Sequence, residues 1–289
     1  MGGLSLMLRR GAIQAHPTIS EGGYILSADK GDPEVFRILM SKGISSDGVG
    51  ITKEDAEKVT SIGQWFRDNK NIIDFRELLF FTKVISIEND AFFGCSSLRM
   101  IDVSNISYIG AGAFYGCEVL TGEINVPKVT GKIGNGSFRN SKILSFIAPY
   151  ATSIDATAFQ YCSSMVTLDI RNVISIGIDA FFGCSTLETI DIRNASIVDN
   201  GAFYGCSALK LVDIQNPASI GDGAFYNCSA LQAVVIRAIT PPTLVSSNAF
   251  SGTNSCLIYV PDESIEVYKT APNWSSIVSR IKPVSEYQG

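Results

Sequence analysis

The sequence predicts a solenoid built mostly of short parallel strands, with a small helical cap at its N-terminal end and a second cap at its C-terminal end. Two observations lead to this fold class. A five-residue block recurs along most of the chain, and a short segment of alternating apolar and polar residues follows most copies. The composition agrees with a well-packed protein, because 46% of the residues are hydrophobic and only 18% are charged.

The recurring block starts with Ala-Phe and ends with Cys, as in Ala91-Phe92-Phe93-Gly94-Cys95. Further copies start at Ala113, Ala158, Ala180, Ala202 and Ala224, and degraded copies stand at Ser137-Phe138 and Ala249-Phe250. Successive phenylalanines lie 22, 24, 21, 22, 22, 22 and 25 residues apart, and leucine-rich repeats have periods of about 20–29 residues. The sequence therefore predicts a leucine-rich-repeat solenoid of about eight units.

A single unit of this length cannot bury its own apolar side chains, so the units must stack. Stacking should bring the phenylalanines of the blocks together as one aromatic spine, made of Phe92, Phe114, Phe138, Phe159, Phe181, Phe203, Phe225 and Phe250. The apolar columns of the repeats then become one continuous core.

The segment after the block reads as one short strand. The clearest example runs from Leu187 to Asn194, where Leu-x-x-Ile-x-Ile alternates with period two. Stacked strands of this kind form a parallel ladder with neighbours about 4.8 Å apart. A second apolar pair, such as Ile176-Gly177, stands four residues before the block, and we expect it to let the chain turn on the back of the coil.

The whole unit, Ala-Phe-x-x-Cys-x-x-Leu-x-x-Ile-x-Ile, resembles the BspA-like leucine-rich repeats. These repeats occur in surface proteins of gut and oral bacteria, in some protists and in phages of such bacteria. The resemblance covers roughly residues 78–289, and its C-terminal end includes Tyr259-Val260-Pro261 and Asn273-Trp274-Ser275. The third unit departs from the pattern, since Ser137 and Ser141 replace Ala and Cys and the loop 131–136 is longer, so we expect a kink or bulge there.

The N-terminal flank reads as a helical cap, since a solenoid must cover the ends of its core. Asp32, followed by Pro and Glu, predicts the start of a helix that Gly43 ends. Thr52-x-x-Asp55 predicts a second helix that starts with a capping box. Asp74 is expected to cap a third helix.

We divide the chain into an N-terminal arm (1–30), the helical N-terminal cap (31–80), the BspA-like repeats (81–255), and the last strand with the C-terminal cap (256–289). The arm is rich in glycine and small residues and shows no clear period. Its apolar side chains would dock it on the solenoid or on a neighbouring chain; the candidate docking residues are Leu4, Leu6, Met7, Leu8 and Ile13.

Six of the seven cysteines share the last position of the block: Cys95, Cys117, Cys162, Cys184, Cys206 and Cys228. We interpret them as small hydrophobic side chains in a buried column, although stacked neighbours would come near disulfide distance. No Cys-x-x-Cys pair and no His near a Cys offers a zinc site, and the single histidine, His16, lies in the arm. We expect no enzymatic activity, no metal and no cofactor.

Charge and hydropathy exclude some partners. The net charge of -5 gives no basic field for nucleic acid. No apolar run approaches the ~20 residues needed to cross a bilayer, and no signal peptide is visible in the sequence.

Polar side chains on the exposed face of the predicted strands repeat in register. One column of acids contains Asp102, Asp169, Asp191 and Asp213, and the next column, two residues further along, contains Arg171, Arg193 and Arg237. Like charges stacked at strand spacing repel each other, so one interpretation is a network in which arginines neutralise acids. The other interpretation is a polar strip that binds a partner, because solenoids present such surfaces for recognition.

We therefore expect a non-enzymatic interaction or adhesion module that presents its repeat surface to a protein or glycan ligand. The resemblance implies the adhesive role, with an extracellular, cell-surface or phage-virion location. The alternative is a structural spacer or assembly subunit, such as a virion component, that docks or self-associates through residues 1–30. Loss of self-association on removal of those residues would favour this alternative.

Overall fold

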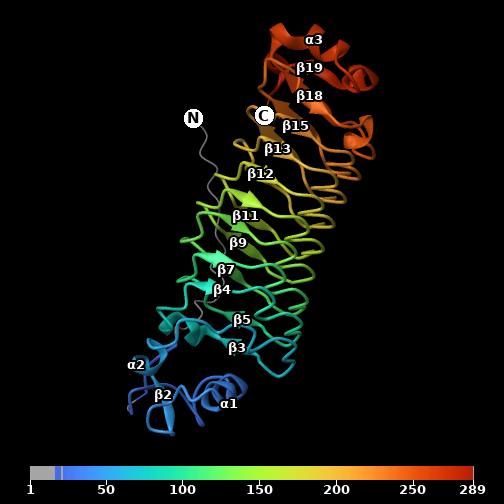
Figure 1. Cartoon of the computed structure of the whole chain (residues 1–289). Helices are drawn as coiled ribbons and strands as arrows, with labels where there is room; N and C mark the ends of the chain where they lie inside the picture. The colour runs from blue at the N-terminus through green and yellow to red at the C-terminus, as the bar shows by residue number, and fades with distance from the viewer. Residues whose placement is uncertain (1–16, 21, 289) are drawn as a thin grey trace.

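The computed structural model describes residues 17–20 and 22–288 of the chain. It is an elongated solenoid whose coils stack from the N-terminal cap at one end to the C-terminal cap at the other (Figure 1). The candidate docking residues of the arm, Leu4, Leu6, Met7, Leu8 and Ile13, and the histidine His16 lie outside the described residues.

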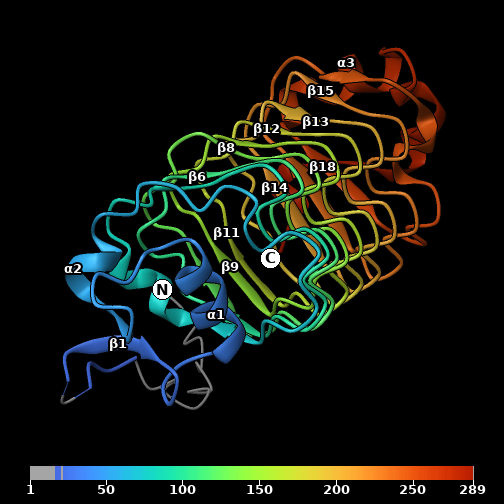
Figure 2. The same cartoon turned by 60° about the horizontal axis from the view of Figure 1, so that its bottom comes forward.

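One side of the solenoid carries a parallel sheet of eight two-residue strands (Figure 2). Their order in the sheet follows the chain, so each strand pairs with those of the turns before and after it. The strands are β4 (Ser86–Ile87), β6 (Tyr108–Ile109), β8 (Lys132–Ile133), β10 (Ser153–Ile154), β12 (Ser175–Ile176), β13 (Ile197–Val198), β15 (Ser219–Ile220) and β17 (Thr243–Leu244). The sequence predicts only a turn at Ile176-Gly177 and its equivalents, but Ile176 and its counterparts lie in this ladder. Two residues are too few for a strand period to be visible.

A different side of each coil carries a second set of parallel strands, most of which follow a block as the sequence predicts. They form three separate groups rather than one unbroken ladder. The groups are β3 (Asp74–Phe75) with β5 (Met100–Ile101); β7 (Glu123–Asn125), β9 (Ser145–Ile147) and β11 (Thr167–Asp169); and β14 (Leu211–Ile214), β16 (Ala233–Ile236), β18 (Leu257–Val260) and β19 (Ile281–Pro283).

The segment that is clearest in the sequence, Leu187 to Asn194, is not a regular strand. Its ladder pairing is a single parallel bridge between Thr189 and Leu211. The predicted alternation still holds, because Ile190 and Ile192 are buried while Asp191 between them is partly exposed. Period-two burial therefore persists where the backbone pairing is interrupted.

The predicted aromatic spine is confirmed. The eight rings stack nearly parallel, with neighbouring centroids 5.1 to 5.6 Å apart. Phe66 extends the spine at the N-terminal end, 5.2 Å from Phe92, and Trp274 covers Phe250 at the C-terminal end. All of these rings are fully buried or nearly so, which makes the spine the centre of the core.

The cysteine column is also confirmed as a buried column of free thiols. Each thiol of the six repeat cysteines donates a hydrogen bond to the carbonyl oxygen of a spine phenylalanine in the preceding turn, over 2.9 to 3.2 Å. The column therefore contributes polar links between turns as well as apolar packing.

Two of the three predicted cap helices are present. Asp32 caps α1 (Pro33–Ser41) by accepting hydrogen bonds from the backbone N–H groups of Glu34 and Val35. Thr52 and Asp55 form the predicted capping box at the start of α2 (Lys53–Ala56). The antiparallel strands β1 (Tyr24–Ser27) and β2 (Gly50–Thr52) lie beside these helices.

The third predicted helix is present only in part, as a short 3-10 helix that begins after the residues expected to start it. Asp74 begins strand β3, and a short 3-10 helix, η1 (Arg76–Phe80), follows it. Tertiary contacts override the local capping signal, because the backbone of Asp74 and Phe75 pairs with β5 in the next turn. A second oxygen of Asp32 accepts the N–H groups of Ile73 and Asp74, at 2.7 and 3.0 Å, which ties α1 to this strand.

The C-terminal end is closed by short helices: η2 (Ser247–Phe250), η3 (Asp262–Ser264), α3 (Ile265–Thr270), η4 (Trp274–Arg280) and η5 (Val284–Glu286). Two fully buried aromatic residues anchor them on the last coils. The Tyr268 hydroxyl donates to the carbonyl oxygen of Ala238, and the Trp274 indole donates to that of Pro242, each over 2.9 Å.

The irregular third unit does not break the stack. Its strand β8 continues the eight-stranded sheet, although it pairs with β6 at one position only, Ile109 with Ile133. The expected irregularity is therefore limited to the loss of one residue pair between β6 and β8. The spine also runs through this unit without a gap, since Phe138 stacks on Phe114 and on Phe159.

Candidate functional site

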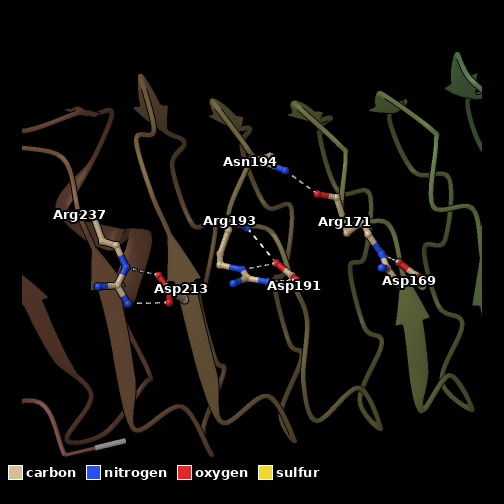
Figure 3. Close-up of polar contacts among 7 residues, drawn as sticks. All are labelled: Asp169, Arg171, Asp191, Arg193, Asn194, Asp213 and Arg237. Atoms are coloured by element: carbon tan, nitrogen blue, oxygen red, sulfur yellow. Dashed lines mark hydrogen bonds and ion pairs between the residues drawn. The ribbon is translucent and has the colours of Figure 1, made fainter.

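Six of the seven charged residues that the sequence singles out lie side by side along four neighbouring turns (Figure 3). We call them the charged strip: Asp169, Arg171, Asp191, Arg193, Asp213 and Arg237. Their strands place alternate side chains on the exposed face, because the intervening isoleucines and valines enter the core. The strip thus follows directly from the repeat.

Two of the ion pairs form within one turn. Arg171 binds Asp169 through two hydrogen bonds of 2.6 and 2.9 Å, and Arg193 binds Asp191 in the same way at 2.7 and 3.0 Å. These bonds hold the pKa of Asp169 and of Asp191 below the ordinary value for an aspartate. Both carboxylates therefore carry their charge at neutral pH.

The third ion pair joins two turns. Two residues after Asp213, where the other two turns have an arginine, this turn has Gln215. The Asp213 carboxylate instead accepts two hydrogen bonds from Arg237 of the following turn, at 2.9 and 3.2 Å. Figure 3 shows this change of partner at one end of the strip. The neutralising network expected from the sequence is present, in two geometries.

Asp102 does not belong to the strip. Its carboxylate accepts from the backbone and hydroxyl of Ser104. The two turns that follow place Asn125 and Ile147 at the equivalent position, in register with Asp169. Asp102 is thus separated from the other acids by two turns that have no charged residue at this position.

Tyrosines flank the strip at both ends, and the sequence analysis did not identify them. Tyr150 is 57% exposed and lies near Arg171. At the other end, Tyr259 and Tyr287 contact each other with ring centroids 5.0 Å apart, and Tyr287 interacts with Asp213 and Arg237. Repeat alignment would have found Tyr259, because its column contains Asp213.

The strip offers hydrogen bonding rather than reactive groups. The three arginine side chains remain 63, 55 and 48% exposed while bound to their aspartates, so they keep donors free for a partner. Burial raises the pKa of Cys95, Cys162, Cys228 and Cys256 to about 12, which leaves these thiols protonated. Within residues 17–20 and 22–288, no three His, Cys, Asp or Glu side chains come together as metal ligands.

The fold and the strip define a class: the chain is a leucine-rich-repeat solenoid with an exposed polar face. The sequence of residues 56–166 and 152–277 matches the model of the BspA type leucine rich repeat region, in six copies. The matched segments span well over half of the chain, so this protein belongs to the BspA-type leucine-rich repeat family. The resemblance inferred from the repeat unit is thereby confirmed.

A solved structure shows the same fold. A leucine-rich repeat protein from Bacteroides ovatus aligns with a TM-score of 0.53 at 21% identity, over 70% of this chain and 59% of that protein. The chain therefore spans about 59% of the length of this relative. A comparison with curated protein sequences gives no match.

Two further structures align at lower TM-scores. One is a leucine rich cell surface protein from Faecalibacterium prausnitzii, with a TM-score of 0.27 at 17% identity over 76% of this chain and 86% of that one. The other is an internalin from Listeria monocytogenes, with a TM-score of 0.26 at 13% identity over 85% and 92%. No helix in the described part of the chain is long and apolar enough to cross a membrane.

Proposed function

We propose that the chain is a non-enzymatic recognition module that binds a protein partner through the charged strip. The observation that carries this proposal is the row of three Asp–Arg pairs on the exposed face, flanked by Tyr150 at one end and by Tyr259 and Tyr287 at the other. Arginine and tyrosine are the residue types enriched at the energetic centres of protein interfaces. The alternating charges would fix the register of the partner.

Family membership supports an interaction role, since the repeats form a continuous surface. We place this recognition in adhesion at an outer surface, either of a bacterial cell or of a phage particle. The family resemblance motivates that location. A docking role for the arm, through Leu4, Leu6, Met7, Leu8 and Ile13, is a separate proposal that does not depend on the charged strip.

The test has two stages. A photo-reactive benzoylphenylalanine at position 150, beside the strip, captures the partner from candidate host-cell surfaces. The purified partner is then titrated by interferometry against the full chain and against the double variant Asp191→Ala, Arg193→Ala. We expect at least a tenfold loss of affinity, and weaker binding as salt is raised, because exposed charges are screened by salt.

The chain provides a matched control. Lys132 and Asp155 form an ion pair of 3.0 Å on the eight-stranded side of the coil, with similar exposure of the cation. The double variant Lys132→Ala, Asp155→Ala removes one ion pair from the surface but leaves the strip intact, so it should bind as the parent does. An affinity that the strip variant leaves unchanged would refute the proposal.

A further inference from the structure

We call the segment that runs from the last two residues of the block to the next strand the corner of a turn. The corners that lead into β7, β9 and β11 differ in length. Ile124, Phe146 and Leu168 are in register in the sheet. The block ends seven residues before Ile124, at Cys117, but five before Phe146, at Ser141. In the next turn the block ends six residues before Leu168. A long corner therefore lies directly beside a short one, and the chain cannot fill the space evenly.

The uneven corners border a surface hollow of about 440 Å³. It is lined by Glu118, Val119, Asn140, Lys142, Tyr161 and Ser163, and its volume lies within the range of small-molecule sites, about 300–1,000 Å³. These residues precede strands β7, β9 and β11, whereas Asp169 of the charged strip ends β11. The hollow and the strip are thus at opposite ends of the same strands.

Two lining residues occupy positions that the fold favours for glycine. Asn140 and Tyr161 stand where other turns have Gly94, Gly116 and Gly183, and they adopt φ angles of 63° and 62°. A left-handed conformation costs a bulky side chain roughly 1–2 kcal/mol relative to glycine. The Tyr161 ring contacts Phe182 of the next turn edge-to-face, with centroids 5.4 Å apart, and the tyrosine side chain remains 45% exposed at the rim of the hollow.

The charged lining residues also depart from the repeat. Glu118 and Lys142 stand where other turns have Ser96 and Ser185. The Lys142 ammonium donates to the Ser163 hydroxyl over 2.9 Å. In the adjoining residues, buried Arg139 Nε and Gln160 Oε1 have no hydrogen-bond partner within the described part of the chain. Buried polar atoms without a partner also occur at Glu77, Glu88 and Ser264 of the described chain, and neither Arg139 nor Gln160 lines the hollow, so only the lining residues support a site here.

We propose that this hollow binds a carbohydrate, with one pyranose ring packed against Tyr161. A carboxylate accepts hydrogen bonds, an ammonium donates them and an amide does both, and each sugar hydroxyl can serve as either partner. The apolar C–H face of a pyranose would cover the exposed tyrosine ring. The opposite charges of Glu118 and Lys142 disfavour a simple anion as the ligand.

The test applies the full chain to an array of neutral and acidic oligosaccharides. The chain carries a fluorescent label on a C-terminal tag, attached by a reaction that does not modify lysines. A bound oligosaccharide is then titrated by calorimetry. Tyr161→Gly and Lys142→Ser restore the residues of other turns, so both variants should fold, and each should weaken binding at least tenfold. Asn227→Gly is the matched control, because Asn227 has a φ of 57° at the same position of a distant corner.

Binding that falls in the two hollow variants and is unchanged in Asn227→Gly supports the proposal. Two results overturn it: no oligosaccharide on the array binds the full chain, or a bound one keeps its affinity in both hollow variants. Binding of a peptide in place of a sugar, lost in the same variants, would also overturn it. The strip variant Asp191→Ala, Arg193→Ala should leave sugar binding unchanged, so this proposal and the proposed protein interface succeed or fail separately.

Discussion

The Cys184 thiol donates a hydrogen bond to the carbonyl oxygen of Phe159, over 3.1 Å and across 25 residues of sequence. Phe159 belongs to the preceding turn, so the bond joins one coil to the next. The same relationship recurs at five other turns. The same carbonyl oxygen also accepts the backbone N–H of Cys162, over 3.0 Å, so the thiol supplies its second hydrogen bond and must stay protonated to donate it.

The buried thiols should be unreactive in the folded chain. At pH 8, Ellman's reagent should modify none of the seven cysteines, because they are buried and their pKa values are raised by burial, in the case of Cys95 to about 12. After unfolding in guanidinium all seven should react. Rapid modification of any thiol under native conditions would contradict the buried column.

Alkaline pH should destabilise the fold. Burial raises the pKa of the Cys162 thiol to about 12, so its stabilising effect is complete below the unfolded value of about 8.5 and is lost as pH rises from there through the folded value. The melting temperature should therefore fall steadily from pH 8.5 upward. In Cys162→Ala, which has no thiol to deprotonate, the fall should be less steep, and identical slopes would argue against the linkage.

Truncation of a middle ring of the spine should be costly. Phe181 is fully buried and stacks on Phe159 and Phe203, so Phe181→Ala should lower the free energy of unfolding by about 3–5 kcal/mol. Ile178 lies in the same turn but is 47% exposed, and Ile178→Ala should cost less than about 0.5 kcal/mol. Urea unfolding followed by circular dichroism measures both, and a loss below about 1 kcal/mol for Phe181→Ala would be inconsistent with the stack.

Asp32 should couple the N-terminal helix to the first repeat strand. It is 6% exposed and accepts four backbone N–H groups, two at the start of α1 and two at Ile73 and Asp74. Asp32→Ala removes the cap and leaves buried donors unpaired, so we expect a loss of about 2–4 kcal/mol. Hydrogen exchange at Ile73 and Asp74 should accelerate together with the α1 amides.

Asp32→Asn is the graded control for this coupling, because it keeps one accepting oxygen. Its free energy of unfolding should lie between that of the parent chain and that of Asp32→Ala. If exchange accelerates only in α1, the bond to the first repeat strand contributes nothing to stability.

A methyl group on one glycine of the eight-stranded side should disturb the stacking of two turns. A Cβ at Gly221 would lie 2.4 Å from the backbone nitrogen of Asn200 and from the carbonyl carbon of Asp199. Since backbone atoms cannot move aside cheaply, Gly221→Ala should cost about 1–3 kcal/mol. At Gly131 no atom lies within 4 Å of such a Cβ, so Gly131→Ala should leave the melting temperature nearly unchanged. Equal effects of the two substitutions would refute the close approach.

The repeat could be predicted from the sequence because the spacing between its residues is fixed along the chain. The recurrence of Ala-Phe at 22-residue intervals near Phe181 and Phe203 requires stacking, since no unit can bury its phenylalanine alone. The period-two pattern predicted the face on which Asp191 and Arg193 lie. Capping chemistry local to Asp32 and Thr52 predicted both α-helices of the N-terminal cap.

Predictions failed where a contact from another turn outweighed a local signal. Asp74 has the chemistry of a helix cap, but its backbone pairs with Met100 and the segment extends into a strand. The two-residue ladder through Ile176 exists only because the turns before and after it supply its hydrogen-bond partners. Neither partner can be identified from residues adjacent in the sequence.

The sequence by itself determined the number of turns, the buried spine and cysteine columns, and the exposed face of charged residues, because each depends on spacing along one chain. Only the tertiary structure decided that Asp213 binds Arg237 rather than a residue of its own turn. It alone placed the long corner of Cys117 beside the short corner of Ser141, where the hollow lies. Both outcomes depend on the register between neighbouring turns, and that register is set by packing of residues more than 20 positions apart.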